Sequence, residues 1–300
     1  MTAAPFGKDT PVGFIGLGVM GTGMAQCLLR AGHRLHVYAR RAQAARPLVE
    51  AGARESVSPA ALARSCPLVF LCLSDDAAVE DVLFAAEGLA AGLAAGACVV
   101  DTSSIAAASA RRFAARLAHQ GVTYLDAPVS GGQQGAHSGT LSCMVGGTAE
   151  AVQACREVMQ SFCKAVVHVG SIGAGQAVKA CNQVAVAGAM LGVADAIALA
   201  LSQGVDPQTM CAVLLDGTAR SFALEKHGPR IIAGDVQPGF RARLMRKDLR
   251  IALETARAGG TALQGAALAE RLVGELCDSG RGELDWNAIG LLVQQKKPAS

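Results

Sequence analysis

The chain has 300 residues, 51% of them hydrophobic but only 4% aromatic, so its interior must consist mainly of small aliphatic side chains. This length can bury two ordinary cores, and we expect two domains. The formal net charge of +3 gives no indication of nucleic acid or an anionic membrane as a partner. The ten cysteines form no C-x-x-C pair and no zinc-like group with histidine, which predicts reduced thiols, no metal site and a cytoplasmic protein.

The first half of the chain predicts a doubly wound α/β domain over residues 11–171. Residues 1–10 contain no apolar run, which argues against a secretory signal, and we expect a disordered extension there. Beyond them, short aliphatic runs alternate with helical stretches, as in a parallel sheet covered by helices. The predicted strands are Val12–Gly16, Arg34–Tyr38, Leu68–Leu73, Cys98–Val100, Thr123–Leu125, Leu141–Val145 and Ala165–Val169.

A glycine-rich segment between the first predicted strand and the first helix predicts a dinucleotide site. It reads Gly16-Leu17-Gly18-Val19-Met20-Gly21, which is the G-x-G-x-x-G pattern. The glycines allow a tight turn and close approach of the backbone to pyrophosphate at a helix N-terminus. A plain glycine-rich turn is the alternative, but the order of strand, motif, helix and second strand favours the cofactor.

The end of the second predicted strand bears on the choice of cofactor. Ala39 stands where an NAD enzyme usually places an acidic residue for the ribose hydroxyls. The next residues, Arg40 and Arg41, offer guanidinium groups suited to a 2′-phosphate unless they are merely solvated, so NADP is favoured over NAD.

Later strand ends should also face the ligands, because ligands lie beyond the carboxyl ends of such strands. We expect Leu73, Ser74 and Ser104 to contact the cofactor, although Ser104 could also cap a helix. In the segment 126–132, Ser130 offers a hydroxyl while Gly131 and Gly132 can expose backbone N–H groups to a carboxylate. From the residues alone, an ordinary turn explains this segment equally well.

After the glycine-rich hinge of residues 170–175 the strand-like runs stop, and residues 172–300 predict a separate domain of about four helices. Its first helix carries Lys179, Asn182 and Gln183 on one face. A lysine ammonium beside a carbonyl oxygen could donate a proton as hydride reduces the carbon, although a single lysine is more often solvated. The apolar run 184–201 reads as a buried helix rather than a membrane span, because Asp195 interrupts it and no aromatic belt flanks it.

These segments together resemble the β-hydroxyacid dehydrogenases, which include 3-hydroxyisobutyrate dehydrogenase, tartronate semialdehyde reductase and glyoxylate reductases. The resemblance covers nearly the whole chain after residue 10 and rests on four ordered segments. These are GFIGLGVMG (13–21), DAPVSGG with GTLSCMVGG (126–132 and 139–147), GAGQAVKACNQ (173–183) and KDL (247–249).

The resemblance implies an NAD(P)-dependent oxidoreductase that interconverts a small hydroxy acid and its carbonyl form. It implies that Lys179 is the general acid/base, that Ser130, Gly131 and Gly132 hold the substrate carboxylate, and that Lys247 contacts the cofactor. Asn182 would orient the reacting group and Gln183 would contact substrate, although many members carry asparagine where Gln183 stands. Ser74 likewise replaces a common proline. The family also implies a homodimer or homotetramer formed through the helical domain.

Three other interpretations remain open. An imine reductase shares the two-domain plan but usually lacks the catalytic lysine. A sensor that binds NADP without turnover would not need the lysine, the amide and the anion-binding loop together. The basic stripe of residues 241–250 could bind nucleic acid, but no recognition motif accompanies it, so we expect a solvated helix face.

Overall fold

The computed structural model describes residues 6–295, and the chain divides into two compact units within this range. The first unit ends at Lys179 and the second begins at Ala180. The sequence placed the boundary earlier, between residues 171 and 172. The structure keeps the first turn of the following helix with the sheet, because the backbone N–H groups of Gly173 and Gln176 both donate to the Asp126 carboxylate.

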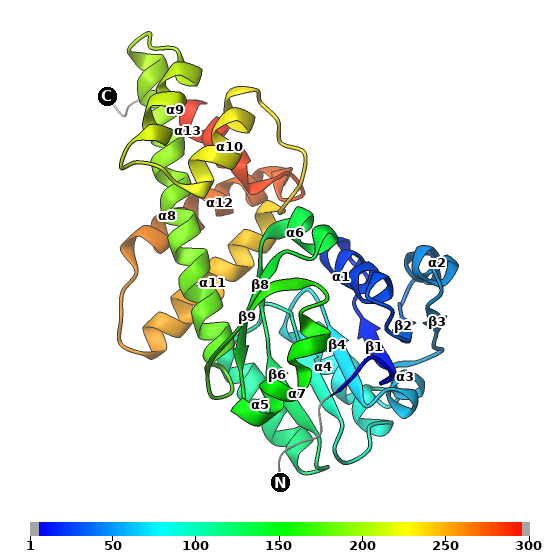
Figure 1. The fold of residues 1–300 in the computed structure, drawn as a ribbon. Coiled ribbons are helices and arrows are strands. Elements are labelled where there is room, and N and C mark those ends of the chain that lie inside the picture. Colours follow the sequence, from blue (N-terminus) through cyan, green and yellow to red (C-terminus); the bar gives the residue numbers. More distant parts are fainter. Residues whose placement is uncertain (1–5, 296–300) are drawn as a thin grey trace. The chain divides into compact units, whose positions relative to one another are not determined.

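The first unit is built on one mostly parallel sheet (Figure 1). The strand order is β3-β2-β1-β4-β5-β6-β8-β7, with β9 paired to β8. Its strands are β1 Val12–Ile15, β2 Leu35–Tyr38, β3 Arg54–Glu55, β4 Leu68–Leu71, β5 Cys98–Asp101, β6 Thr123–Asp126, β7 Val129–Ser130, β8 Leu141–Gly146 and β9 Cys163–Gly170. The predicted doubly wound fold is therefore confirmed.

Helices cover both faces of this sheet, because successive strand residues point to opposite sides. On β1, Phe14 packs in one core while Ile15 packs in the other. Helices α1, α2, α6 and α7 contribute to the first core, and α3, α4 and α5 contribute to the second. Their bounds are α1 Val19–Arg30, α2 Ala42–Glu50, α3 Pro59–Ser65, α4 Asp76–Phe84, α5 Ala107–Ala118, α6 Gly132–Ser138 and α7 Ala149–Met159.

Three details of the first unit differ from the prediction. The two-residue strands β3 and β7 were not predicted, because such short segments carry no measurable periodicity. Strand β8 runs antiparallel to β6 and β7, so the sheet is not wholly parallel. Residues 1–5 of the predicted disordered extension lie outside the described residues. Phe6 is bound to the first unit, since its N–H donates to the Ala154 carbonyl and its ring packs against the core.

The second unit is helical, and its core lies around Met190, Ile197, Leu249, Val273 and Trp286. It begins within the long helix α8, which spans Ala174–Ser202 and crosses the unit boundary. The remaining helices are α9 Pro207–Asp216, α10 Phe222–Ile232, α11 Ala242–Ala258, α12 Gln264–Leu276 and α13 Ile289–Gln295. The prediction of about four helices missed the break at Gly259–Gly260, which separates α11 from α12.

By length and composition alone, helix α8 could span a membrane. Within its most apolar stretch of 18 residues, 33% of the residues are buried in the structure. The prediction of burial on all sides is therefore wrong. One face, with Met190 and Ile197, lies in the core of the second unit. The opposite face exposes small or apolar residues together with one acid, at alternating spacings of three and four: Cys181, Ala185, Gly188, Gly192, Asp195 and Leu199.

Candidate active site

The turn between β1 and α1 has the geometry that a dinucleotide pyrophosphate requires. Gly16 takes a φ of +103°, and a Cβ there would lie 2.2 Å from the Cys72 carbonyl oxygen. A Cβ on Gly21 would lie 1.9 Å from the Gly16 oxygen, so both positions need glycine. A Cβ on Gly18, in contrast, would meet nothing within 4 Å. Gly18 is the N-cap of α1 and no side chain caps the helix there, so the first N–H groups of α1 can receive an anion.

The end of β2 supplies no carboxylate to this site. Ala39 is half-buried and packs against the core, while Arg40 and Arg41 are exposed. Arg41 is also the N-cap residue of α2. Among residues 6–295, no carboxylate forms an ion pair with either guanidinium group. A phosphate beside this turn would therefore meet two cations and a helix N-terminus.

The serines predicted to contact the cofactor do not cap the neighbouring helices. Asp75, and not Ser74, is the N-cap of α4, and its Oδ1 accepts a hydrogen bond from the Ala78 N–H. Helix α5 has Ala106 as its N-cap, so the alternative role of Ser104 as that cap is wrong. Leu73 is positioned by its own N–H, which donates to Ser103 Oγ at 2.8 Å. Ser103 was not singled out from the sequence.

The predicted substrate loop and the predicted proton donor meet within the first unit. Gly131 and Gly132 take φ values of +133° and +64°, conformations that disfavour any residue with a Cβ. Immediately before them, the Val129 carbonyl accepts a hydrogen bond from Lys179 Nζ at 3.0 Å. The ammonium group is therefore held beside Ser130 at the start of the loop, in a partly buried position.

Two fully buried carboxyl groups lie next to each other at the ends of β5 and β6, where Asp101 and Asp126 are register partners. Burial raises the pKa of Asp101 to about 6, although hydrogen bonds from Ser103 and Tyr124 oppose the shift. Burial also raises the pKa of Asp126, against the hydrogen bonds that it receives from Gly173 and Gln176. These acids were not predicted as site residues, although a carboxylate at the end of a buried strand was a usable signal.

In the second unit, the predicted amides and Lys247 belong to one network centred on Asp248. Asn182 Nδ2 donates to Gln183 Oε1 at 2.8 Å, and Gln183 Nε2 donates to Asp248 Oδ2 at 2.7 Å. Lys247 Nζ lies 3.1 Å from Asp248 Oδ1. Gln183 is 5% exposed and both ends of its amide are engaged, while its predicted substrate contact stays a prediction. The geometry makes it a support for Asn182.

The basic stripe on α11 is neutralised by neighbouring acids. Arg241 and Arg243 both pair with Glu283. Arg246 pairs with Asp278 at 2.8 Å and shares Glu270 with Arg250. A cation that already has a carboxylate partner is less available to a phosphate, and the absence of nucleic-acid binding stays a prediction.

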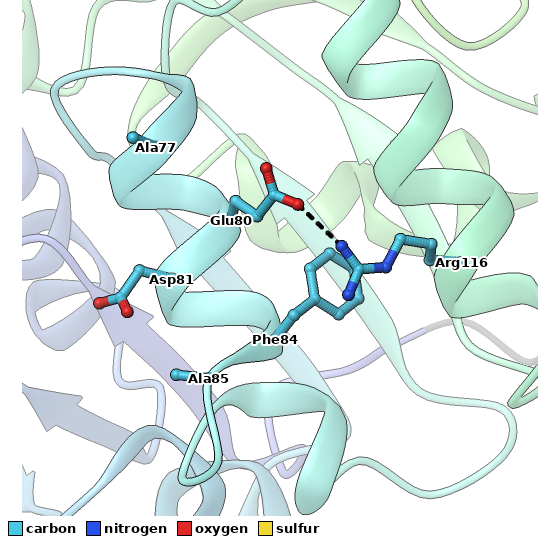
Figure 2. Close-up of a pocket in the computed structure, with 6 residues that line it drawn as sticks. All are labelled: Ala77, Glu80, Asp81, Phe84, Ala85 and Arg116. Carbon is cyan, nitrogen blue, oxygen red and sulfur yellow. Dashed lines mark hydrogen bonds and ion pairs between the residues drawn. The ribbon is translucent and has the colours of Figure 1, made fainter.

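A separate hollow of about 400 Å³ lies on the first unit, lined by residues of α4 and α5 with the adjoining Ala85 (Figure 2). Arg116 lies over the Phe84 ring, 3.5 Å from its centroid, and pairs with Glu80 at 2.8 Å. The site residues predicted from the sequence do not line this hollow. We assign this hollow no role in the chemistry.

Two family models match the chain. Residues 11–170 match the NAD-binding domain of 6-phosphogluconate dehydrogenase. Residues 173–292 match the NAD-binding region of NADP-dependent 3-hydroxyisobutyrate dehydrogenase. The division between the two models falls at the glycine-rich hinge, close to the boundary expected from the sequence, whereas the compact units divide slightly later.

Individual proteins match over almost their whole length. The 2-hydroxy-3-oxopropionate reductase of Escherichia coli is 38% identical over 93% of this chain and 95% of its own length. The 3-hydroxyisobutyrate dehydrogenase of Pseudomonas aeruginosa is 36% identical over 96% of this chain and 99% of its own. Among solved structures, 3-hydroxyisobutyrate dehydrogenase of Mycobacterium tuberculosis with L-serine has a TM-score of 0.87 and 29% identity, covering 95% and 99% of the two chains.

Proposed function

The chain belongs to the β-hydroxyacid dehydrogenase family of NAD(P)-dependent oxidoreductases acting on CH–OH groups, and on this premise we propose that Lys179 and the loop Ser130–Gly132 interconvert a small 3-hydroxy acid, or a 2-hydroxy-3-oxo acid, and its carbonyl form. The observation that carries the proposal is the hydrogen bond from Lys179 Nζ to the Val129 carbonyl. It holds a cation beside a loop whose glycine conformations and serine hydroxyl suit a carboxylate.

Each part of the proposed site has a separate role in the reaction. The Ser130 hydroxyl and the N–H groups of Gly131 and Gly132 bind the substrate carboxylate. NAD(P), which the turn at Gly16–Gly21 would hold, would supply the hydride for reduction and would accept it in oxidation. In reduction, the π electron pair of the C=O bond moves onto the oxygen as the new C–H bond forms. Lys179 stabilises that oxygen and gives it a proton, so an Nζ–H bond breaks and an O–H bond forms. Oxidation returns the proton to the amine.

A substrate panel tests this proposal. We expect the chain to oxidise NADPH with at least one of tartronate semialdehyde, succinic semialdehyde, methylmalonate semialdehyde and glyoxylate. Propanal, an aldehyde without a carboxylate, should react at least about tenfold more slowly in kcat/KM, because one charge-assisted contact contributes about 1.5 kcal/mol or more. Serine and threonate test the reverse direction. Turnover of a cyclic imine without turnover of any acid would support the imine reductase alternative and contradict the proposal.

We also propose NADP as the preferred cofactor, supported by Arg40, Arg41 and the match to a model of NADP-dependent enzymes. Replacing both arginines by alanine should raise the KM for NADPH by about 10-fold to 100-fold, because charge-assisted hydrogen bonds contribute about 1.5–3 kcal/mol. The KM for NADH should stay within about threefold.

Arg46→Ala is the matched control for this pair, because Arg46 is an exposed arginine on the same helix α2 whose partner is Glu50. It should leave both KM values unchanged. Equal increases for NADPH and NADH in the double variant would show that the two arginines do not select a 2′-phosphate.

A further inference from the structure

The start of α8 is held by a carboxylate from the sheet. Asp126 Oδ1 accepts a hydrogen bond from the Gly173 N–H at 2.7 Å, and Oδ2 accepts one from the Gln176 N–H at 2.9 Å. Such N–H groups at a helix start have no partner within the helix. A buried negative charge at this end also interacts favourably with the helix dipole. One side chain therefore satisfies and orients the first turn of α8.

The packing around this carboxylate leaves it little freedom. Asp126 is fully buried, and a Cβ on Gly146 would lie 2.3 Å from its Oδ1. A Cβ on Gly175 would lie 2.6 Å from the Asp126 carbonyl oxygen and 2.9 Å from its Oδ2. Glycines at both positions thus allow the strand end and the helix start to approach each other. A shift of the Asp126 side chain would be transmitted to the helix.

A second contact fixes the same turn from the helix side. Gln176, which is 3% exposed, donates through Nε2 to the Ser103 carbonyl at 2.8 Å and accepts at Oε1 from the Ile105 N–H at 3.1 Å. Lys179 follows Gln176 by three residues, so the two project from neighbouring positions on one face of the helix. The rotation and height of the helix at Gln176 therefore set where the Lys179 ammonium can reach.

We infer that Asp126 is a positioning residue for the proton transfer, with Gln176 as the second anchor. The segment from β6 to β7 anchors α8 through Asp126, accepts the ammonium of Lys179 at Val129 and continues into the loop Ser130–Gly132. One short piece of chain thereby fixes both the proton donor and the loop proposed to hold the substrate carboxylate. This inference rests on the function proposed above for Lys179.

The first test is Asp126→Asn, which keeps the shape but places an NH₂ group against a backbone N–H. We expect kcat to fall by about 100-fold, because a misplacement of about 1 Å at a reacting group costs on that order. The dissociation constant for NADPH should stay within about threefold, since the glycine turn does not touch Asp126. Hydrogen exchange of residues 173–179 should become faster in the variant, a measurement that needs no turnover.

Asp285→Asn is the matched control. Asp285 is another fully buried carboxylate that accepts backbone N–H groups, from Gly239, Phe240 and Asn287, none of which lies on α8. It should lose thermal stability comparably while kcat stays within about threefold. If Asp126→Asn does not fold, Gln176→Leu removes the second anchor and should also lower kcat and speed hydrogen exchange of residues 173–179.

The possible failures can be told apart. Faster exchange in Asp126→Asn with wild-type kcat would overturn the positioning role and leave the role of Lys179 intact. Equal losses of kcat in Asp126→Asn and Asp285→Asn would reduce Asp126 to a stabilising residue, which also overturns the inference. Failure of the proposed function has a different signature, namely a Lys179→Ala variant that turns over like the wild type.

Discussion

Replacing Lys179 by alanine should lower kcat by about a thousandfold, while the dissociation constant for NADPH stays within about threefold. The size follows from the contribution of a positioned general acid, about 10²–10⁴ in rate. Binding should survive because the predicted pyrophosphate site is the turn at Gly16–Gly21, which does not include α8. Steady-state kinetics and a fluorescence titration with NADPH measure the two quantities separately.

Two controls make this result interpretable. The thermal unfolding midpoint of Lys179→Ala should lie within a few degrees of the wild type, because a half-buried surface side chain contributes about 1 kcal/mol or less. Lys164→Ala, which removes an exposed lysine on β9, should leave kcat unchanged. Wild-type turnover in Lys179→Ala would support a different proton donor. A sensor would show no turnover in either the wild type or the variant.

Replacing Gly18 by aspartate should weaken binding of both NADPH and NADH by at least about 100-fold, or about 2.7 kcal/mol. Gly18 is an N-cap in an extended conformation, and its Cβ position is open. Aspartate is a favourable N-cap, so the fold should keep its stability within a few tenths of a kcal/mol. The new carboxylate, however, would accept hydrogen bonds from the N–H groups that we expect to bind pyrophosphate. It would also repel the negative charge of the pyrophosphate. Calorimetric titration gives the binding constants.

Gly265→Asp is the matched control for this change. Gly265 lies in the first turn of α12, and a Cβ there also meets nothing within 4 Å. The substitution adds the same charge near a helix start that is not part of the glycine turn of α1. Cofactor binding should be unchanged. Unaltered binding in Gly18→Asp would show that the N-terminus of α1 does not hold the dinucleotide.

The fold could be predicted because the signals for its strands and for the glycine turn lie within short stretches of sequence. The predicted strands all occur, since short continuous aliphatic runs are typical of strands that are buried on both faces of a parallel sheet. The glycine turn could also be predicted, because Gly16 and Gly21 each meet a steric requirement that one short motif records, while Gly18 leaves the start of α1 open. The face of α8 that stays exposed could not be predicted, since an apolar residue in the sequence does not reveal which neighbour covers it.

The supporting residues of the site were harder to predict, because they act through contacts distant in sequence. Asp126 receives hydrogen bonds from residues 47 and 50 positions later, and Asp248 receives one from Gln183, 65 positions earlier. Both acids stood inside quoted motifs, but spacing alone does not pair a carboxylate with a remote N–H group. The burial of Gln183 could not be predicted either, because it follows from the contact of α8 with α11 in the second unit.

The central claim is that Lys179 gives the proton while the carbonyl carbon receives a hydride. The most direct measurement follows deuterium from NADPH with both C4 hydrogens replaced by deuterium into the product of the best acid in the panel, by mass spectrometry, for wild type and Lys179→Ala. The account predicts deuterium on the former carbonyl carbon with the wild type and about a thousandfold slower labelling with the variant. Unlabelled product, or labelling at the wild-type rate without the lysine, would contradict it.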